Sequence, residues 1–387
     1  MIGAELTLEL ARFPDRPRER LRAWDAADVL AIEHVRRESG DVLAQRAGVL
    51  GDEWGAITCG LLASGVGEVV HIGDSFVAQQ AARANLARND LSTSAVQFLD
   101  ARTTPTGMLD ALVVKVPKSR AVLDEWLRVV RPAVPDGIEV VATAMVRHMH
   151  TSTLEVLDRR VGATRTTLAQ RKARLALSRV DARVDTVTRW PHRWTVAVDE
   201  SGAGPTIVGH VGAFAAERLD AGTAALLEAL ERHGAARPTS LVDLGCGTGV
   251  VGLVEAWRDE ALEVVFIDES FDAVASAAAG WHATFGSRPA RFVVGDRLET
   301  VAVGAPLGPG SVDRVVVNPP FHSGHALSDA TAWDMFVQSR RVLRAGGDLW
   351  VVGNRHLGYH AALKRVLGNA TVVASTSAFV VLRSVKR

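Results

Sequence analysis

The stretch from Ser240 to Gly249 constrains the fold most, because it predicts a buried strand that runs directly into a glycine-rich loop. Gly245, Gly247 and Gly249 stand at alternate positions after the strand. Glycine adopts positive φ and lets a ligand approach the backbone closely, and the N-terminus of the helix expected over 250–257 favours an anionic group. This order is typical of a parallel α/β sheet that binds its ligand at the carboxyl ends of its strands. The G-x-G-x-G spacing differs from that of dinucleotide loops, which argues against NAD.

Acidic residues stand at or beside the ends of the strands expected in this half of the chain. Asp243 lies in the first strand and is expected to face the methionyl end of a cofactor. Asp268 ends the strand expected over 263–267, about 20 residues after the glycine loop, where a carboxylate can hold both ribose hydroxyls. Glu269 remains an alternative for that role. Asp296 follows the strand expected over 291–294 and can accept a hydrogen bond from an adenine amine.

A second motif follows about 70 residues after the loop. Three valines predict a buried strand, and two prolines after Asn318 end it in a stiff turn, because proline cannot continue a ladder. The amide oxygen of Asn318 and the carbonyls of the prolines are free acceptors. Together they form a slot for a planar group that bears an NH2, with a flat apolar ring beside it. The motif consists of Asn318, Pro319, Pro320 and Phe321.

The glycine loop and the Asn-Pro-Pro-Phe motif, in this order, predict a class I S-adenosylmethionine (SAM) methyltransferase that acts on an amino nitrogen. Asn318 and the Pro319 carbonyl are expected to accept the two amine hydrogens and direct the lone pair at the methyl group. No strong general base is needed before the transfer. Asn318 to Phe321 are the candidate catalytic residues, and the candidate cofactor residues are Asp243, Gly245, Gly247, Gly249, Asp268 and Asp296.

The N-terminal half is predicted to be a diverged copy of the C-terminal half. Strands and helices alternate in both, and a strand that ends at Lys115-Val-Pro-Lys118 stands where Asn318 stands later. The copy lacks the chemistry, because Trp54 obstructs its loop and a lysine cannot accept an amine's hydrogens. We therefore expect an α/β fold with two tandem Rossmann-like methyltransferase domains, the N-terminal one degenerate. The expected divisions are 1–185 for that domain, 186–200 for a linker and 201–387 for the catalytic domain.

The charge of the chain is balanced, with 44 Lys and Arg against 44 Asp and Glu, which argues against a whole-surface nucleic-acid binder. A local excess of basic residues precedes the linker, and it has two interpretations: a phosphate-contacting face for RNA or a solvated surface. His322 and His325, after the second motif, are either substrate contacts or ordinary loop histidines. The candidate RNA-binding residues are Arg165, Arg171, Lys172, Arg174 and His322.

The two cysteines, Cys59 and Cys246, lie far apart and form neither a ligand motif nor a disulfide framework. The histidines after the second motif have no acidic partner, so no metal site is expected. The N-terminus has no apolar core, and no signal peptide or membrane span is expected. We therefore expect a cytoplasmic monomer with no metal and no membrane association.

The chain resembles the bacterial ribosomal RNA guanine-N2-methyltransferases that carry two tandem methyltransferase-like domains. It is most similar to the member that modifies large-subunit rRNA. The resemblance covers nearly the whole chain and rests on the two motifs together with Gly73-Asp-Ser-Phe76, Lys115-Val-Pro-Lys118, His150-Thr-Ser-Thr-Leu154, Trp333-Asp-Met-Phe336, Asn354-Arg-His-Leu357 and Phe379-Val-Val-Leu382.

The resemblance implies that SAM is the cofactor, that rRNA is the partner, and that Asn318 to Phe321 hold the target guanine. One departure is visible, because Ala215 and Ala216 replace the polar pair that follows Phe214 in the family, which puts a substrate contact from this segment in doubt. Three other substrates stay open: a guanine of small-subunit rRNA, adenine in DNA and a glutamine of a release factor. The basic N-terminal half favours RNA among them.

Overall fold

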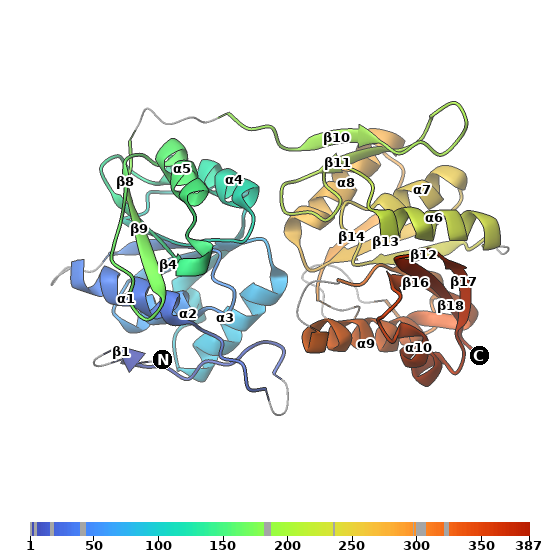
Figure 1. Ribbon diagram of the computed structural model, residues 1–387, viewed down its shortest axis with the longest axis horizontal. Helices are drawn as coiled ribbons and strands as arrows, with labels where there is room; N and C mark the ends of the chain where they lie inside the picture. Colours follow the sequence, from blue (N-terminus) through green and yellow to red (C-terminus); the bar gives the residue numbers. More distant parts are fainter. Residues whose placement is uncertain are drawn as a thin grey trace. The chain divides into compact units, whose positions relative to one another are not determined.

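The computed structural model describes residues 2–3, 6–15, 19–38, 44–181, 187–234, 237–296, 298, 307–320 and 325–387. The chain divides into two compact units, Met1–Arg189 and Trp190–Arg387 (Figure 1). Each unit contains a seven-stranded sheet. Residues 190–200 therefore belong to the second unit, although the sequence analysis expected them in a linker. They include β10 (His192–Thr195), which pairs with β11 (Thr206–Gly209) of the same unit.

The sheet of the N-terminal unit has the strand order β5-β4-β3-β6-β7-β9-β8. Its first five strands are parallel, whereas β9 and β8 run antiparallel to their neighbours. The short strands β1 and β2 pair separately. The strands are β1 (Ile2–Gly3), β2 (Leu6–Thr7), β3 (Arg46–Leu50), β4 (Glu68–Gly73), β5 (Val96–Asp100), β6 (Ala111–Lys115), β7 (Glu139–Met145), β8 (Thr164–Thr166) and β9 (Ala173–Arg179).

Helices cover both faces of this sheet. Apolar side chains of α1 and α2 pack on one face, and those of α4 and α5 pack on the other. Ser75 and Ser119 cap α3 and α4, and each side chain accepts a hydrogen bond from a backbone N–H of the first turn. The helices are α1 (Ala26–Glu38), α2 (Ala56–Ala63), α3 (Phe76–Arg88), α4 (Arg120–Val130) and α5 (Thr151–Arg160), with single 3₁₀ turns at Thr93–Ala95, Arg131–Ala133 and Val146–His148.

The sheet of the C-terminal unit has the order β14-β13-β12-β15-β16-β18-β17, and its first five strands are again parallel. The central strand β15 is buried on both faces, because Val315, Val316 and Val317 are at most 1% exposed. The strands are β12 (Ser240–Leu244), β13 (Glu263–Asp268), β14 (Arg291–Val294), β15 (Val312–Val317), β16 (Leu343–Asn354), β17 (Thr371–Ser375) and β18 (Phe379–Val385).

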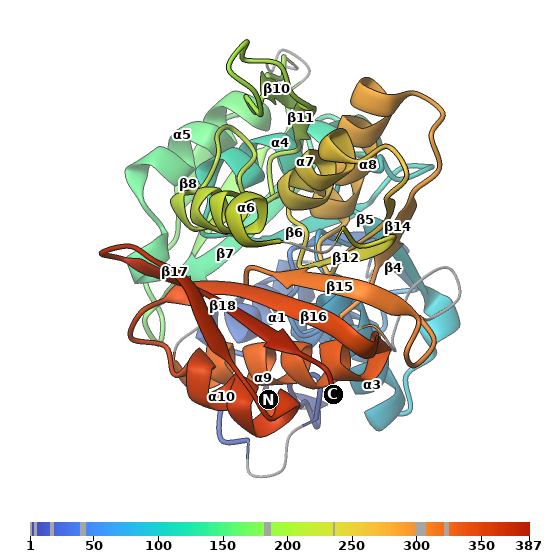
Figure 2. The same cartoon turned by 90° about the vertical axis from the view of Figure 1, so that its right-hand side faces the viewer.

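Figures 1 and 2 show α6, α7 and α8 on one face of this sheet and α9 and α10 on the other. Two apolar clusters match these layers: one joins α6, α7 and α8 to the sheet, and the other joins α9 and α10 to it. Asp220 caps α6 and Ser270 caps α8. The helices are α6 (Ala221–His233), α7 (Val250–Arg258), α8 (Phe271–Phe285), α9 (His325–Val342) and α10 (Tyr359–Leu367).

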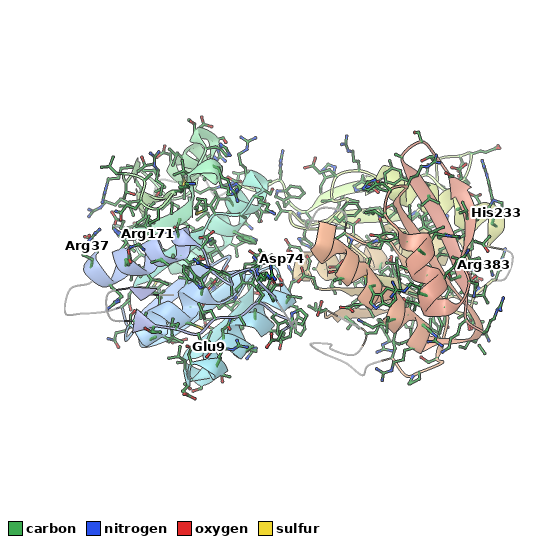
Figure 3. All side chains as sticks on the ribbon, turned by 60° about the horizontal axis from the view of Figure 1, so that its bottom comes forward. Glu9, Arg37, Asp74, Arg171, His233 and Arg383 are labelled. Atoms are coloured by element: carbon green, nitrogen blue, oxygen red, sulfur yellow. The ribbon has the colours of Figure 1, made fainter. Side chains whose placement is uncertain are left out.

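A buried ion pair network joins β15, the strand that leads into the second motif, to β16 and β18. The guanidinium of Arg314, on β15, donates to both oxygens of Asp348 at 2.8 and 3.1 Å. Arg383, labelled in Figure 3, donates from β18 to the same carboxylate at 2.9 Å. Because Asp348 and Arg314 are both almost fully buried, this network ties β15 to β16 and β18 in one register.

The two sheets have the same strand order when the strands of each unit are taken in sequence. The agreement extends to the turns after β3 and β12. Gly51 and Gly245 have φ of 79° and 72°, and Gly55 and Gly249, each at the N-terminus of a helix, have φ of 75° and 77°. The prediction of two tandem Rossmann-like domains is therefore confirmed.

Candidate active site

The glycine loop of the C-terminal unit lies between β12 and α7. All three of its glycines have positive φ, between 53° and 77°. A Cβ on Gly247 would lie 3.1 Å from the Phe214 carbonyl oxygen, and a Cβ on Gly249 would lie 2.8 Å from the Cβ of Ala277. Both the backbone conformation and the available space therefore require glycine at these positions.

Asp268 connects this loop to the end of β13. One of its carboxylate oxygens accepts the N–H of Gly247 at 2.9 Å, and the other accepts the N–H of Ser270 at 3.0 Å. Burial raises the pKa of Asp268, while these backbone donors act in the opposite direction. The backbone N–H groups of Gly247, Glu269 and Ser270 all act on this carboxylate, which has about four acceptor sites, so it can still accept a hydrogen bond from a ribose. The neighbouring Glu269 is exposed.

A cavity of about 320 Å³ opens at the carboxyl ends of β12, β13, β14 and β15. Its volume lies in the range of small-molecule sites. The cavity brings together Gly245, Asp268, Asp296 and Asn318, which the sequence analysis selected from four different strand ends. Its lining consists of Gly212, Phe214, Leu244, Gly245, Ile267, Asp268, Glu269, Ser270, Ala273, Gly295, Asp296, Asn318, Pro319, Pro320, Thr331 and Met335.

Asp243 lies beside this cavity and lines a second one of about 20 Å³, which Asn318 also lines. One carboxylate oxygen accepts the N–H of Gly252 at 2.9 Å. Burial raises the pKa of Asp243 to about 7, and the nearby Asp268 charge adds to this effect. A positively charged ligand at the glycine loop would therefore favour the ionised form of Asp243.

Asn318 has an asymmetric environment at the end of β15. Its Nδ2 donates to the Oγ1 of Thr223 at 3.0 Å. Its Oδ1 is buried and has no hydrogen-bond partner among the residues that the structure describes. A buried acceptor without a partner costs about 1–3 kcal/mol, so the side chain is arranged for a donor that a ligand would supply. Pro319 is buried and Pro320 is exposed. Phe321 and His322 lie outside the described residues.

The structure adds Phe214, which the sequence analysis left in doubt. Phe214 lines both cavities, and its carbonyl oxygen accepts the N–H of Thr248 at 3.2 Å. The next residue, Ala215, has φ of 60°, a conformation that residues other than glycine rarely adopt. Thr331 and Met335 on α9 also line the larger cavity. Met335 belongs to the Trp333-Asp-Met-Phe336 stretch that carries the family resemblance, whereas no motif in the sequence indicates Thr331.

In the N-terminal unit, the corresponding strand ends border a smaller cavity of about 100 Å³, and the charged groups there are paired within the chain itself. The carboxylate of Asp52 accepts the N–H groups of Ala56 and Thr58 at 3.0 and 2.8 Å, so it occupies the N-terminus of α2. Lys115 takes the place of Asn318, and its Nζ donates to Asp25 at 2.7 Å and to Asp28 at 2.6 Å. An internal anion and an internal cation thus replace the groups that a cofactor and an amine substrate would contact.

The basic candidates divide into two groups. Arg171 and Lys172 form the turn between β8 and β9, with φ of 51° and 65°. Arg171 is 66% exposed at its side chain and lies 3.5 Å from Glu33 on α1, and Figure 3 shows it at the surface. Arg165 and Arg174 lie on the strands β8 and β9. Arg165 is 67% exposed at its side chain and forms an ion pair with Glu139 at 2.8 Å, and Arg174 is partly exposed.

Among the residues that the structure describes, no group of three or more His, Cys, Asp or Glu side chains could hold a metal ion. No helix within this described part of the chain is long and apolar enough to cross a membrane.

The strand order, the glycine cradle, the acidic strand ends and the unpartnered acceptor of Asn318 define a class: this is a SAM-dependent methyltransferase. Comparison with known proteins agrees with that class. Residues 204–383 match the family model described as the methyltransferase small domain, and residues 2–182 match the RLMG N-terminal domain. The chain belongs to the ribosomal RNA large subunit methyltransferase G family, as the resemblance implied.

Two relatives and one solved structure give the extent of the similarity. The proteins named ribosomal RNA large subunit methyltransferase G from Streptomyces griseus and Stutzerimonas stutzeri are 48% and 39% identical to this chain. Each comparison covers 98% of this chain and 97% of the relative. The T. thermophilus 16S rRNA N2 methyltransferase, in complex with AdoMet and guanosine, has a TM-score of 0.73 over 92% of both chains at 22% identity, which shows the shared fold.

Proposed function

We propose that this chain transfers the methyl group of SAM to the exocyclic N2 amine of a guanine in large-subunit ribosomal RNA. The buried, unpartnered Oδ1 of Asn318 carries the proposal, because it borders the cavity that contains the cofactor candidates. An acceptor in this position fits an amine, whose hydrogens are donors. The names of the relatives support rRNA of the large subunit as the substrate.

The proposed chemistry depends on orientation more than on proton abstraction. The N2 lone pair of guanine is delocalised into the ring, so the amine is a poor nucleophile. Asn318 Oδ1 and the Pro319 carbonyl accept the two amine hydrogens, direct the lone pair toward the methyl group, and stabilise the positive charge that develops on nitrogen. When SAM is bound, it supplies an electrophilic methyl group.

The base must leave its stack to enter this slot, which costs a few kcal/mol and least for an unpaired base. The buried Pro319 keeps the turn stiff, so the acceptors are in place before the base arrives. Phe321 is proposed to stack on the base, and His322 to contact the substrate next to it. Gly245, Gly247, Gly249, Asp243, Asp268 and Asp296 are proposed to hold SAM, with Asp268 rather than the exposed Glu269 on the ribose.

The turn between β8 and β9 is proposed as an RNA contact. A two-residue turn with two positive φ values favours Asn-Gly, and a residue with a Cβ there costs about 1–2 kcal/mol. Arg171 and Lys172 nevertheless occupy both positions, and Leu168 beside them is 85% exposed. Strain of this kind often marks a functional site, and two cations on an exposed tip fit RNA phosphates. Arg165 and Arg174 are proposed only as weaker contacts.

We further propose that the protein acts in the cytoplasm as a monomer and without a metal. Size-exclusion chromatography with light scattering tests whether the protein is a monomer. Activity that survives dialysis against a chelator tests whether it acts without a metal.

Asn318→Ala tests the proposal directly. With labelled SAM and large-subunit rRNA, we expect kcat to fall about 100-fold or more, the scale of losing one preorganised polar contact in a transition state. SAM affinity, measured by calorimetry, should stay within about twofold. Small-subunit rRNA, DNA and release factor are offered separately to the unmodified protein, and labelled product is digested to identify the methylated base. Turnover of Asn318→Ala close to normal, or label in one of the other substrates, would contradict the proposal.

A further inference from the structure

We infer that Thr223 is a positioning residue that fixes the orientation of the Asn318 amide, and this inference rests on the proposed role of Asn318. An asparagine amide has an acceptor and a donor at opposite ends of a nearly symmetric group. Rotation by half a turn would replace Oδ1 with an NH2 group, which would repel an amine substrate. The site therefore needs a feature that distinguishes the two orientations.

The contacts of Thr223 provide that feature. Thr223 lies in the first turn of α6 and is 5% exposed. Its Oγ1 accepts a hydrogen from Asn318 Nδ2 at 3.0 Å and donates to Asp220 Oδ2 at 3.4 Å. The same carboxylate oxygen accepts the backbone N–H of Thr223 at 3.0 Å, so Asp220 is held in place as the cap of α6.

The direction of these hydrogen bonds follows from the geometry at Asp220. Its Oδ2 accepts from the hydroxyl of Thr223, so the hydroxyl proton points toward Asp220. The lone pairs of the hydroxyl then face Asn318 and select its NH2 group. With the amide reversed, Thr223 would have to turn its proton to Asn318 Oδ1 and lose its bond to Asp220. The series of hydrogen bonds from Asp220 through Thr223 to Asn318 thus leaves the Oδ1 of Asn318 free for the substrate.

Two rigid elements hold the residues of this hydrogen-bond series, although Thr223 and Asn318 are 95 positions apart in the sequence. Thr223 stands at the capped start of α6, and Asn318 follows the buried strand β15. Removal of the hydroxyl should therefore change the orientation of one amide without moving either backbone. The expected consequence is a loss of kcat with little change in SAM binding.

The test uses the full-length protein, labelled SAM and large-subunit rRNA. Thr223→Val removes the hydroxyl and keeps the shape, and we expect kcat to fall about 10-fold, the size of one lost hydrogen bond in the transition state. Thr223→Ser keeps the hydroxyl and should recover most of that loss. Asp220→Asn keeps a good helix cap but can also donate, so its kcat should lie between those two variants. Thr371→Val, at an exposed threonine of the same unit, is the matched control and should match the unmodified protein.

A double-mutant cycle separates positioning from a general structural effect. If Thr223 acts through Asn318, adding Thr223→Val to Asn318→Ala should change kcat by less than about twofold. Multiplied losses in the double variant, unchanged kcat in Thr223→Val, or no recovery in Thr223→Ser would overturn the inference. If Thr223→Val lowers the melting temperature, Thr223→Ala carries the same cycle. Normal turnover of Asn318→Ala would instead refute the proposed function.

Discussion

Gly249 at the start of α7 allows a prediction whose size follows from the structure. Its φ of 77° costs a residue with a Cβ about 1–2 kcal/mol. An added Cβ would also lie 2.8 Å from the Cβ of Ala277 and 3.1 Å from its Cα, an overpacking that costs about 1–3 kcal/mol. Gly249→Ala should therefore destabilise the C-terminal unit by about 2–5 kcal/mol. For a unit of this size, each kcal/mol lowers the melting temperature by about 2–4 °C.

Gly368→Ala is the matched control for this prediction. Gly368 has φ of 82° after α10, but an added Cβ there would meet no atom within 4 Å. Only the conformational cost of about 1–2 kcal/mol applies to it. Scanning calorimetry of the full chain measures both variants, and the transition that SAM raises belongs to the C-terminal unit. Equal shifts for the two variants, or a smaller shift for Gly249→Ala, would refute the steric part of the reasoning.

Three further predictions concern charge. Asp348→Asn should destabilise the C-terminal unit by about 3–5 kcal/mol, because the buried Arg314 loses its counter-charge. Urea unfolding measures this change in the free energy of unfolding. Glu228→Ala, which removes one partner of an exposed ion pair, is the control. Because burial raises the pKa of Asp243 to about 7, its contribution to stability falls as pH rises from about 4 to 7. The ionised form favours the SAM cation, so calorimetry should find weaker SAM binding as pH falls below 7, and Asp243→Asn should remove that dependence. Reversal of Arg171 and Lys172 to Glu should weaken RNA binding and reduce its salt slope by about 1 per lost contact, whereas an unchanged slope would identify a solvated surface.

The sequence predicts the sheet and part of the cavity lining because of one geometric rule. Parallel strands place their carboxyl ends at one edge, so polar residues that follow separate strands must converge. Gly245, Asp268, Asp296 and Asn318 illustrate this rule, since each lies at the end of a strand or within two residues after it, and all four line the same cavity.

Other parts of the site depend on side-chain packing, which has no short sequence signature. Thr223 and Phe214 reach the site from elements that precede the glycine loop, and their contacts depend on the positions of α6 and of the turn at Ala215. The partners of Lys115 also have no short sequence signature, because Asp25 and Asp28 precede it by 90 and 87 residues. The residue type of Lys115 excluded amine chemistry, but it did not indicate which carboxylates would neutralise it.

The carboxylate of Asp52 at the start of α2 has a thermodynamic consequence. It gives the N-terminal unit an acceptor group of its own at the position where the C-terminal unit offers backbone N–H groups to a ligand. A ligand at 100 times its dissociation constant adds about 2.7 kcal/mol to the unit that binds it. The stability of the C-terminal unit is thus coupled to the supply of methyl donor. The N-terminal unit carries the equivalent group within its own sequence, so its stability is the same whether the donor is abundant or depleted.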